Sequence, residues 1–269
     1  SGQFSHYIAN GAECEPLLHK DIELMKRHIP QIAEAMRVIG DCCGAALYFA
    51  AKEKYADVWR VAGDALRKCG INPIYLDDIF PAGDEFEIVH TALGVVIPPA
   101  NIPLAVGAAV NNVETLYNIH RALSGEPVIE KWLTIAGEVE KPFTSVVPLG
   151  TPASALIEFA KPTLDDFAII EGGPMMGALV PADEPVKKTT SGFLVLPLEH
   201  RAVRYRRMAM RDVLRLAASV CMQCRSCTDL CPRYLLGHPI EPHKIMRSAA
   251  LPLSLPIEQM TGALLCSEC

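Results

Sequence analysis

The feature that most constrains this chain is a run of four closely spaced cysteines near its carboxyl end. Cys221, Cys224, Cys227 and Cys231 follow the pattern C-x2-C-x2-C-x3-C, and Pro232 comes directly after them. This is the bacterial ligand pattern of [4Fe–4S] clusters, in which the fourth cysteine commonly ligates a second cluster. The proline breaks the local helix, so the fourth sulfur points away from the first three. The spacing therefore predicts electron transfer through iron–sulfur centres.

A second cysteine pair, Cys266 and Cys269, stands at the end of the sequence, so that six of the eight cysteines of a two-cluster module are present. Paired C-x2-C motifs also suit a tetrathiolate zinc site, but this alternative leaves Cys227 and Cys231 without a purpose. Disulfides are less favoured still, because the chain is long and acidic and shows no secretory leader.

Composition excludes several classes of protein. The 269 residues allow one large domain or two to three small ones, and the hydrophobic half of them can fill a real core. A net charge of −6 argues against a general nucleic-acid binder. No apolar run approaches the roughly 20 residues needed to span a bilayer, so we expect no direct membrane insertion. The basic cluster over residues 201–207 fits a solvated helix or linker, with docking to an acidic redox partner as the alternative.

The first part of the chain predicts a parallel α/β arrangement of Rossmann-like character. Helices are expected over 21–39 and 55–69, with strands over 45–50, 72–76 and 94–97. Pro30 should kink the first helix and Gly40 should end it. Cys42 and Cys43 are expected to be small buried side chains. The dinucleotide fingerprint G-x-G-x-x-G is absent from this stretch.

Two polar motifs in this part are candidates for ligand binding. Residues 10–16 form a predicted loop whose Glu13 and Glu15 could receive the hydroxyls of a ribityl or ribose chain. The alternative is a solvated acidic turn, which the residues by themselves favour slightly. The run from Asn111 to Glu114 is capping-box-like and predicts a helix start with free N–H groups suited to a phosphate. A plain helix cap is the alternative.

Residues 126–180 change character and predict a small α+β module. Strands are expected over 131–139, 142–148 and 167–170, with a helix over 153–160. The loop from Gly172 to Gly177 predicts either a tight turn or the close approach of a partner to its backbone. Residues 181–207 resemble a connector, and a helix over 211–220 leads into the cysteine run. His238 and His243 follow it, and helix-surface or turn positions are favoured over positions near a cluster.

Taken together, the motifs resemble those of the RnfC/PduS family, relatives of the flavin-carrying subunit of respiratory complex I. The matching stretches occur in one order, namely 10–16, 111–115, 172–177 and the cysteine run. Residues 11–20 and 231–237 look closer to the PduS branch, whose members reduce cobalamin in bacterial microcompartments.

The resemblance implies an α/β Rossmann-like flavin domain over 1–124, a β-grasp (SLBB) α+β module over 125–190 and an all-α ferredoxin-like tail over 191–269. It implies an NADH-dependent oxidoreductase in which electrons pass through FMN and two [4Fe–4S] clusters to cobalamin or to a redox partner protein. The SLBB module is suspected of binding soluble ligands, cobalamin among them. The implied location is the cytoplasm, either free or inside a microcompartment. A peripheral subunit of a membrane ion-translocating complex is the alternative within the family.

The resemblance also implies which residues bind the cofactors. Asn10, Glu13 and Glu15 would line the flavin and nicotinamide site, and Asn111, Asn112 and Thr115 would hold FMN at a helix start. Cys221, Cys224 and Cys227 would bind one cluster, and Cys231, Cys266 and Cys269 the other.

The sequence departs from the family at both ends. Family members carry a glycine-rich G-G-x-G-F-P loop before the Asn10 motif and two further cysteines after Cys269. Neither lies in this sequence, which begins with Ser1 and Gly2. We therefore expect a piece of a longer protein that by itself binds FMN poorly and holds incomplete or labile clusters.

Overall fold

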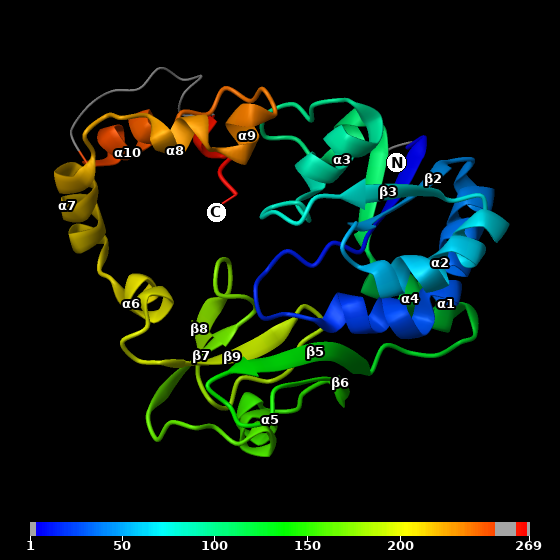
Figure 1. The fold of residues 1–269 in the computed structure, drawn as a ribbon, viewed down its shortest axis with the longest axis horizontal. Helices are drawn as coiled ribbons and strands as arrows, with labels where there is room; N and C mark the ends of the chain where they lie inside the picture. Colours follow the sequence, from blue (N-terminus) through cyan, green and yellow to red (C-terminus); the bar gives the residue numbers. More distant parts are fainter. Residues whose placement is uncertain (1–3, 251–261, 268–269) are drawn as a thin grey trace.

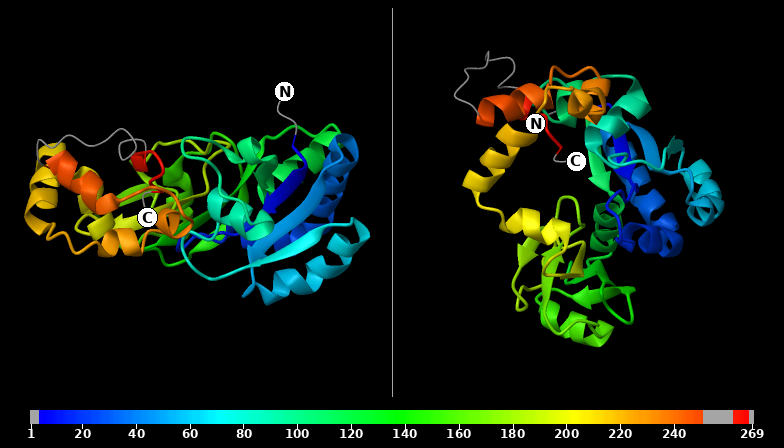
Figure 2. Two further views of the ribbon diagram at one scale, coloured as in Figure 1. Left: turned by 90° about the horizontal axis from the view of Figure 1, so that it is seen from above. Right: turned by 60° about the vertical axis from the view of Figure 1, so that its left-hand side comes forward.

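The computed structural model describes residues 4–250 and 262–267. Figure 1 shows two β-sheets and a helical tail, with the tail forming an arc that brings the chain back to helix α3. Seen from above, the tail lies at one end of the molecule and the first sheet at the other (Figure 2, left). Among the described residues, no helix is both long enough and apolar enough to cross a membrane.

The first sheet is entirely parallel, with the order β3-β2-β1-β4. Its strands are β1 (His6–Asn10), β2 (Ala46–Lys52), β3 (Asn72–Leu76) and β4 (Ala108–Asn112). Such an order begins many doubly wound α/β folds, because β2 and β3 extend to one side of β1 and the chain then returns to place β4 on the other side. The predicted parallel α/β arrangement is confirmed.

Helices cover both faces of this sheet. Helices α1 (Lys20–Cys43), α2 (Ala56–Lys68) and α4 (Val113–Leu123) share a core on one face, while α3 (Glu85–Leu93) packs on the other, where the 3-10 turn η1 (Pro103–Val106) also lies. Strand alternation explains the two cores, since Tyr7 and Ala9 of β1 enter the first and Ile8 enters the second.

The second sheet is mixed, with the order β6-β5-β9-β7-β8. Its strands are β5 (Glu130–Gly137), β6 (Phe143–Pro148), β7 (Phe167–Glu171), β8 (Ala178–Val180) and β9 (Gly192–Pro197). The central pair β5 and β9 is parallel, and the other pairs are antiparallel. Helix α5 (Ala153–Ala160) packs on one face, and Val203 of α6 (Arg201–Arg207) packs on the other face together with Leu18.

The described tail is helical, with α7 (Met210–Val220), α8 (Ser226–Asp229), α9 (Pro232–Leu235) and α10 (Pro242–Ala250). Its small core contains Cys231, Ile240 and Leu265, and Phe86 of α3 packs against this core. The tail therefore touches the first sheet's helical layer, although α3 and α9 are far apart in sequence.

Several local predictions are confirmed and others are wrong. Helix α1 is kinked at His28, two residues before Pro30, as the proline predicted. It runs through Gly40, however, and ends at Gly44 with a φ of 67°. Gly40 is a packing position, because an added Cβ would lie 3.0 Å from the Leu47 side chain. Since the helix continues, Cys42 and Cys43 lie on its last turn and are exposed rather than buried.

Three further predictions are corrected by long-range packing. Residues 94–97 form no strand, and the fourth parallel strand is β4. The expected connector over 181–207 contains β9, a central strand buried on both faces, and helix α6. His238 and His243 are buried, not surface residues. His243 Nδ1 lies 2.7 Å from the Thr228 hydroxyl, so its position is set by the packing of α10 on α8.

Candidate functional site

The carboxyl ends of β1 and β4 meet at the point where the strand order reverses. Asn10 and Asn112 end these strands and are direct partners across them. Asn111 lies one position earlier in β4, beside Ala9. Open α/β sheets bind their ligands outside the carboxyl ends of the strands at such a point. The structure therefore brings three of the predicted site residues together at a position typical of nucleotide binding.

Each of these asparagine side chains has partners within the protein. Asn10 Nδ2 donates to the Gly83 carbonyl at 2.8 Å, and Asn10 Oδ1 accepts from the Ala12 amide at 3.0 Å. The Tyr7 hydroxyl donates to Asn111 Oδ1 at 2.7 Å. Burial raises the pKa of Tyr7 to about 12, so this hydroxyl keeps its proton.

Asn112, not Asn111, is the N-cap of α4. Its Oδ1 accepts from the Glu114 amide at 2.8 Å, and its Nδ2 donates to Asp21 Oδ2 at 3.0 Å. Thr115 is exposed on the first turn of the helix that Asn112 caps. The helix start predicted from the sequence is thus present one residue later, with Thr115 open to solvent beside it.

A cluster of buried charges lies behind this edge, and sequence reasoning missed it. Lys20 Nζ lies 2.6 Å from Asp21 Oδ1 and 3.2 Å from Glu114 Oε2. Glu114 also pairs with Lys131 and accepts from the Trp132 amide at 3.1 Å. The cluster joins the start of α1, the start of α4 and strand β5, and so ties the two sheets together.

Glu13 sits at the rim of the buried charge cluster. It is 8% exposed, and its Oε2 accepts from the Asp21 amide at 3.1 Å. Burial, followed by the negative charge of Asp21, raises the pKa of Glu13 to about 8. For Lys20, burial acts in the opposite direction, but the carboxylates of Asp21 and Glu114 outweigh it and raise the pKa. Burial and the neighbouring charge of Lys20 lower the pKa of Lys131, and Glu114 acts in the opposite direction.

Glu15 binds the loop of the second sheet. Its carboxylate accepts from the amides of Met175 at 3.0 Å and Met176 at 2.7 Å. A Cβ on Gly173 would lie 2.1 Å from Glu15 Oε2, which explains the glycine at that position. Glu13 and Glu15 therefore do not converge on one ligand in this structure. The group that closely approaches the backbone of the 172–177 loop is therefore the carboxylate of Glu15.

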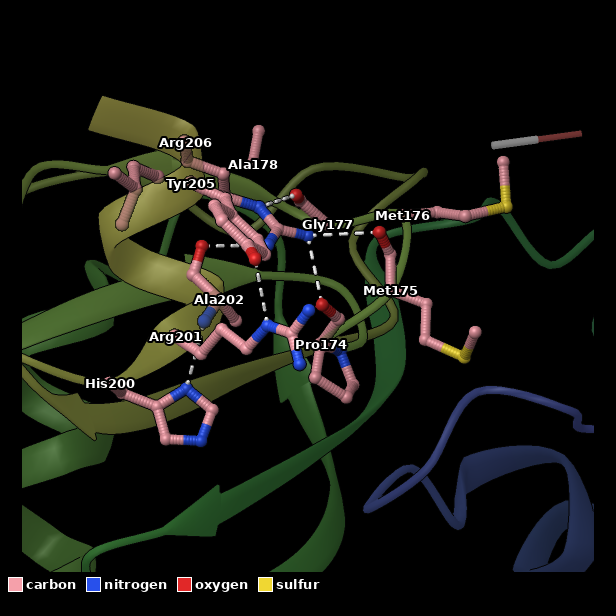
Figure 3. Close-up of a pocket in the computed structure, with 11 residues that line it drawn as sticks. Pro174, Met175, Met176, Gly177, Ala178, His200, Arg201, Ala202, Tyr205 and Arg206 are labelled. Atoms are coloured by element: carbon pink, nitrogen blue, oxygen red, sulfur yellow. Dashed lines mark hydrogen bonds between the residues drawn. The ribbon is translucent and has the colours of Figure 1, made fainter. Parts of the chain in front are cut away.

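Arg206 of α6 holds the other side of the same loop. Figure 3 shows its guanidinium directed at the loop carbonyls, where it donates to Gly177 at 2.6 Å and to Pro174 and Met175 at 3.0 Å each. The loop is thus bound through its amides on one side and through its carbonyls on the other. Beside it lies a cavity of about 1010 Å³ between residues 174–179 and 200–206. A second cavity of about 740 Å³ lies between residues 17–23 and the β5–β6 hairpin.

The cysteines of the tail differ in their surroundings. Cys231 is buried in the tail's small core, whereas Cys224 and Cys227 are exposed. Hydrogen bonds from the Ser226 hydroxyl and amide lower the pKa of Cys224. Gln223 Nε2 lies 2.9 Å from Cys221 Sγ. Cys266 is exposed, and Cys269 lies outside the described residues.

The donor set of the tail fits a cluster, although the described side chains do not form a ready-made site. Across residues 4–250 and 262–267, no three His, Cys, Asp or Glu side chains lie close enough together to hold a metal ion. Metal sites commonly assemble as the metal binds, so the ligands need not be gathered beforehand. Thiolates at this spacing, one of them buried against an apolar core, are the donors that a [4Fe–4S] cluster requires.

Two protein-family models match parts of this chain. Residues 2–121 match the Nuo51 FMN-binding domain, and residues 220–269 match a 4Fe–4S dicluster domain. The chain thus carries a match to an FMN-binding domain followed by a match to a dicluster domain, and these matches support FMN and [4Fe–4S] clusters as its cofactors.

Individual relatives confirm the resemblance to the RnfC/PduS family. The chain is 41% identical to the cobalamin reductase PduS of Citrobacter freundii over 99% of its own length. It is also 41% identical to PduS of Salmonella typhimurium, again over 99% of its length. It is 29% identical to a subunit of the ion-translocating oxidoreductase complex of Haemophilus influenzae, over 91% of this chain and 30% of that protein. The chain spans about 60% of the length of the two PduS proteins.

A solved structure supports the fold alone. A chain of the NAD⁺-reducing [NiFe]-hydrogenase in the H₂-reduced state superposes with a TM-score of 0.62 at 19% identity, covering 79% of this chain and 43% of that one. The mixed α/β architecture with one parallel and one mixed sheet is thus shared with an established protein structure.

Proposed function

We propose that this chain is part of an NADH-dependent flavin and iron–sulfur oxidoreductase that delivers electrons to cobalamin. The observation that carries the proposal is the presence, in one chain, of a parallel-sheet switch point and a C-x2-C-x2-C-x3-C-P run. The 41% identity to cobalamin reductases favours cobalamin as the acceptor and, through the resemblance, a cytoplasmic or microcompartment location.

Three units would divide this work. The parallel sheet and helices α1–α4 would form the flavin unit, near residues 1–124. The second sheet would form a β-grasp (SLBB) module, since its first and last strands are central and parallel and a helix follows its first hairpin. We extend this module beyond residue 190 to include β9. The remaining helices would form the ferredoxin-like tail.

The flavin site would lie at the carboxyl ends of β1 and β4. Thr115 and the N–H groups at the start of α4 would bind the phosphate of FMN, because a helix start favours an anion. Asn10, Asn111 and Asn112 would keep the two strand ends in place. Glu13 and Glu15 would line the edge facing the nicotinamide, and their present hydrogen bonds hold the loop that carries them.

The thiolates of Cys221, Cys224 and Cys227 would bind one cluster, and those of Cys231, Cys266 and Cys269 would contribute to the other. When bound, FMN accepts two electrons as a hydride from NADH and releases them one at a time, which matches the one-electron capacity of a cluster. The protein's own part is to hold the two kinds of centre in one molecule and to shield them from water.

Anaerobic reconstitution of the full-length protein tests the proposal. We expect bound FMN, two clusters, a brown colour and an EPR signal that appears on reduction with NADH. Cys224→Ser should lower the iron content, whereas the exposed Cys42→Ser should not change it. A colourless protein that binds zinc and shows no EPR signal on reduction with dithionite would overturn the proposal in favour of a zinc-bound module.

A peripheral subunit of a membrane ion-translocating complex is the second candidate, favoured by the 29% identity to a subunit of such an oxidoreductase complex over most of this chain. The two candidates differ in their partners. Copurification with membranes in the host cell would support the second, and reduction of cob(II)alamin or cob(III)alamin by the isolated protein would support the first.

A further inference from the structure

The contact between the tail and the first sheet depends on one buried arginine. Arg233 lies on α9, two residues after Cys231, and is 7% exposed. Its Nη2 donates to Asp84 Oδ2 at 2.7 Å, and its guanidinium carbon lies 3.6 Å from the ring centroid of Phe86. Asp84 is the N-cap of α3, where it also accepts from the Phe86 amide at 2.8 Å. Arg233 therefore fastens the tail to the start of α3.

This ion pair leaves most of the guanidinium unused. Nε and Nη1 of Arg233 are buried, and neither has a hydrogen-bond partner among residues 4–250 and 262–267. A buried guanidinium with unsatisfied donors is costly, so native proteins normally supply acceptors for these groups. A simple structural ion pair with Asp84 does not account for them.

Two of the cysteines predicted to hold the second cluster, Cys231 and Cys266, belong to the same part of the tail as Arg233. Cys231 belongs to the small core against which Phe86 packs, together with Leu265, the neighbour of Cys266. Burial lowers the pKa of Arg233, and the negative charges of Asp84, Glu87, Cys231 and Cys266 act in the opposite direction. Asp84 already accepts from Nη2, and sulfur ligands are acceptors of suitable charge for the N–H groups of Nε and Nη1.

We propose that Arg233 is a positioning residue for the second cluster: Nη2 fixes the tail on α3, and Nε and Nη1 donate to the sulfur atoms of the cluster bound by Cys231 and Cys266. Hydrogen bonds and positive charge at the sulfurs stabilise the reduced cluster, which carries one more negative charge, and so raise its reduction potential. The inference rests on the proposed function, because it requires that a cluster binds there.

The test is an EPR-monitored redox titration of the reconstituted full-length protein. In Arg233→Gln, the reduction equilibrium of one cluster should become about tenfold less favourable, a shift of about 59 mV to lower potential for one electron, while the other cluster stays unchanged. Arg225→Gln is the matched control, since Arg225 stands between Cys224 and Cys227 but is 48% exposed at its side chain. Its charge is screened by solvent, so neither potential should move appreciably.

Two further variants separate docking from tuning. Asp84→Asn weakens the attachment of the tail but keeps the guanidinium, so amide exchange in α9 should accelerate with less change in potential than in Arg233→Gln. Arg233→Lys keeps the charge but loses the planar fork, so the potential should fall between wild type and Arg233→Gln. If Arg233→Gln does not fold, the reduction potential of Arg233→Lys still tests the proposal.

The outcomes distinguish the inference from the function on which it rests. If wild-type protein binds no cluster, the proposed function fails and the inference fails with it. If both clusters are present and their potentials are unchanged in both Arg233 variants, the inference alone is overturned.

Discussion

The buried charges behind β1 and β4 and the cysteine tail are built in opposite ways. In the first region, Lys20, Asp21 and Glu114 satisfy one another at distances of 2.6–3.2 Å within the protein. In the second, the described thiols do not gather into a metal site, and Arg233 Nε and Nη1 are buried without acceptors in the part of the chain that the structure describes. The comparison teaches that the buried charges of the first region pair with one another, whereas the second region carries donors and thiols that a bound cluster would use.

Loss of a charge from the first region should have the largest effect on stability. Lys20→Met leaves the carboxylates of Asp21 and Glu114 buried with less compensation, so we expect the free energy of unfolding to fall by about 3–5 kcal/mol. Urea denaturation measures this. Arg37→Met, which breaks an exposed pair with Asp41, should cost less than about 1 kcal/mol. Equal losses in the two variants would contradict the interpretation of the first region.

Assembly of the iron–sulfur clusters without added FMN should stabilise the second region selectively. Because ligand binding stabilises the folded state by mass action, reconstitution at 100 times the dissociation constant should contribute about 2.7 kcal/mol. Hydrogen exchange should therefore slow by up to roughly 100-fold in residues 221–247 and remain unchanged in β1. Uniform protection of both regions, or none in the tail, would remove the contrast between them.

Glu15 tests the link between the first sheet and the loop of the second. Glu15→Ala removes the acceptor for the Met175 and Met176 amides, so we expect a loss of about 1–3 kcal/mol. Amide exchange at these two residues should accelerate. Glu140→Ala is the control, since Glu140 is exposed and lies 3.7 Å from Lys161 Nζ. Unchanged exchange in Glu15→Ala would show that Arg206 alone holds the loop.

The last prediction concerns pH and measures a slope rather than a total loss of stability. Burial raises the pKa of Glu13 from 4.5 to about 8, so between these values the unfolded chain loses its proton while the folded protein keeps it. Stability should therefore fall as pH rises from 5 to 8, by at most about 1.4 kcal/mol per pH unit, and level off above 8. In Glu13→Gln this component of the slope should disappear. A slope equal to that of wild type in the variant would assign it to other groups.

Much of the local structure could be predicted from the sequence. Strand β3 and helix α5 have the predicted limits, and the kink near Pro30 follows from the proline's missing N–H. Strand β9 was missed because a strand buried on both faces shows no alternation, and flanking prolines and charges suggested a connector. The exposure of Cys42 and Cys43 depended on whether the helix continued past Gly40, which packing against Leu47 decides.

The candidate sites divide in the same way. The spacing of the cysteines predicted the kind of metal centre, a [4Fe–4S] cluster. The asparagines and the glutamate of residues 111–114 predicted the helix start near Asn112. The roles of Glu15 and Arg233 could not be predicted in this way, since their partners lie 160 and 149 positions away.

By itself, the sequence determined the periodic segments, the helix caps and the kind of metal centre that the cysteines suit, because these depend on neighbouring residues. Only the tertiary structure decided which buried charges are paired, which loop Glu15 holds and where Arg233 fastens the tail. Those contacts join distant residues, and their free energy comes from burial and pairing that exist only after the chain has packed.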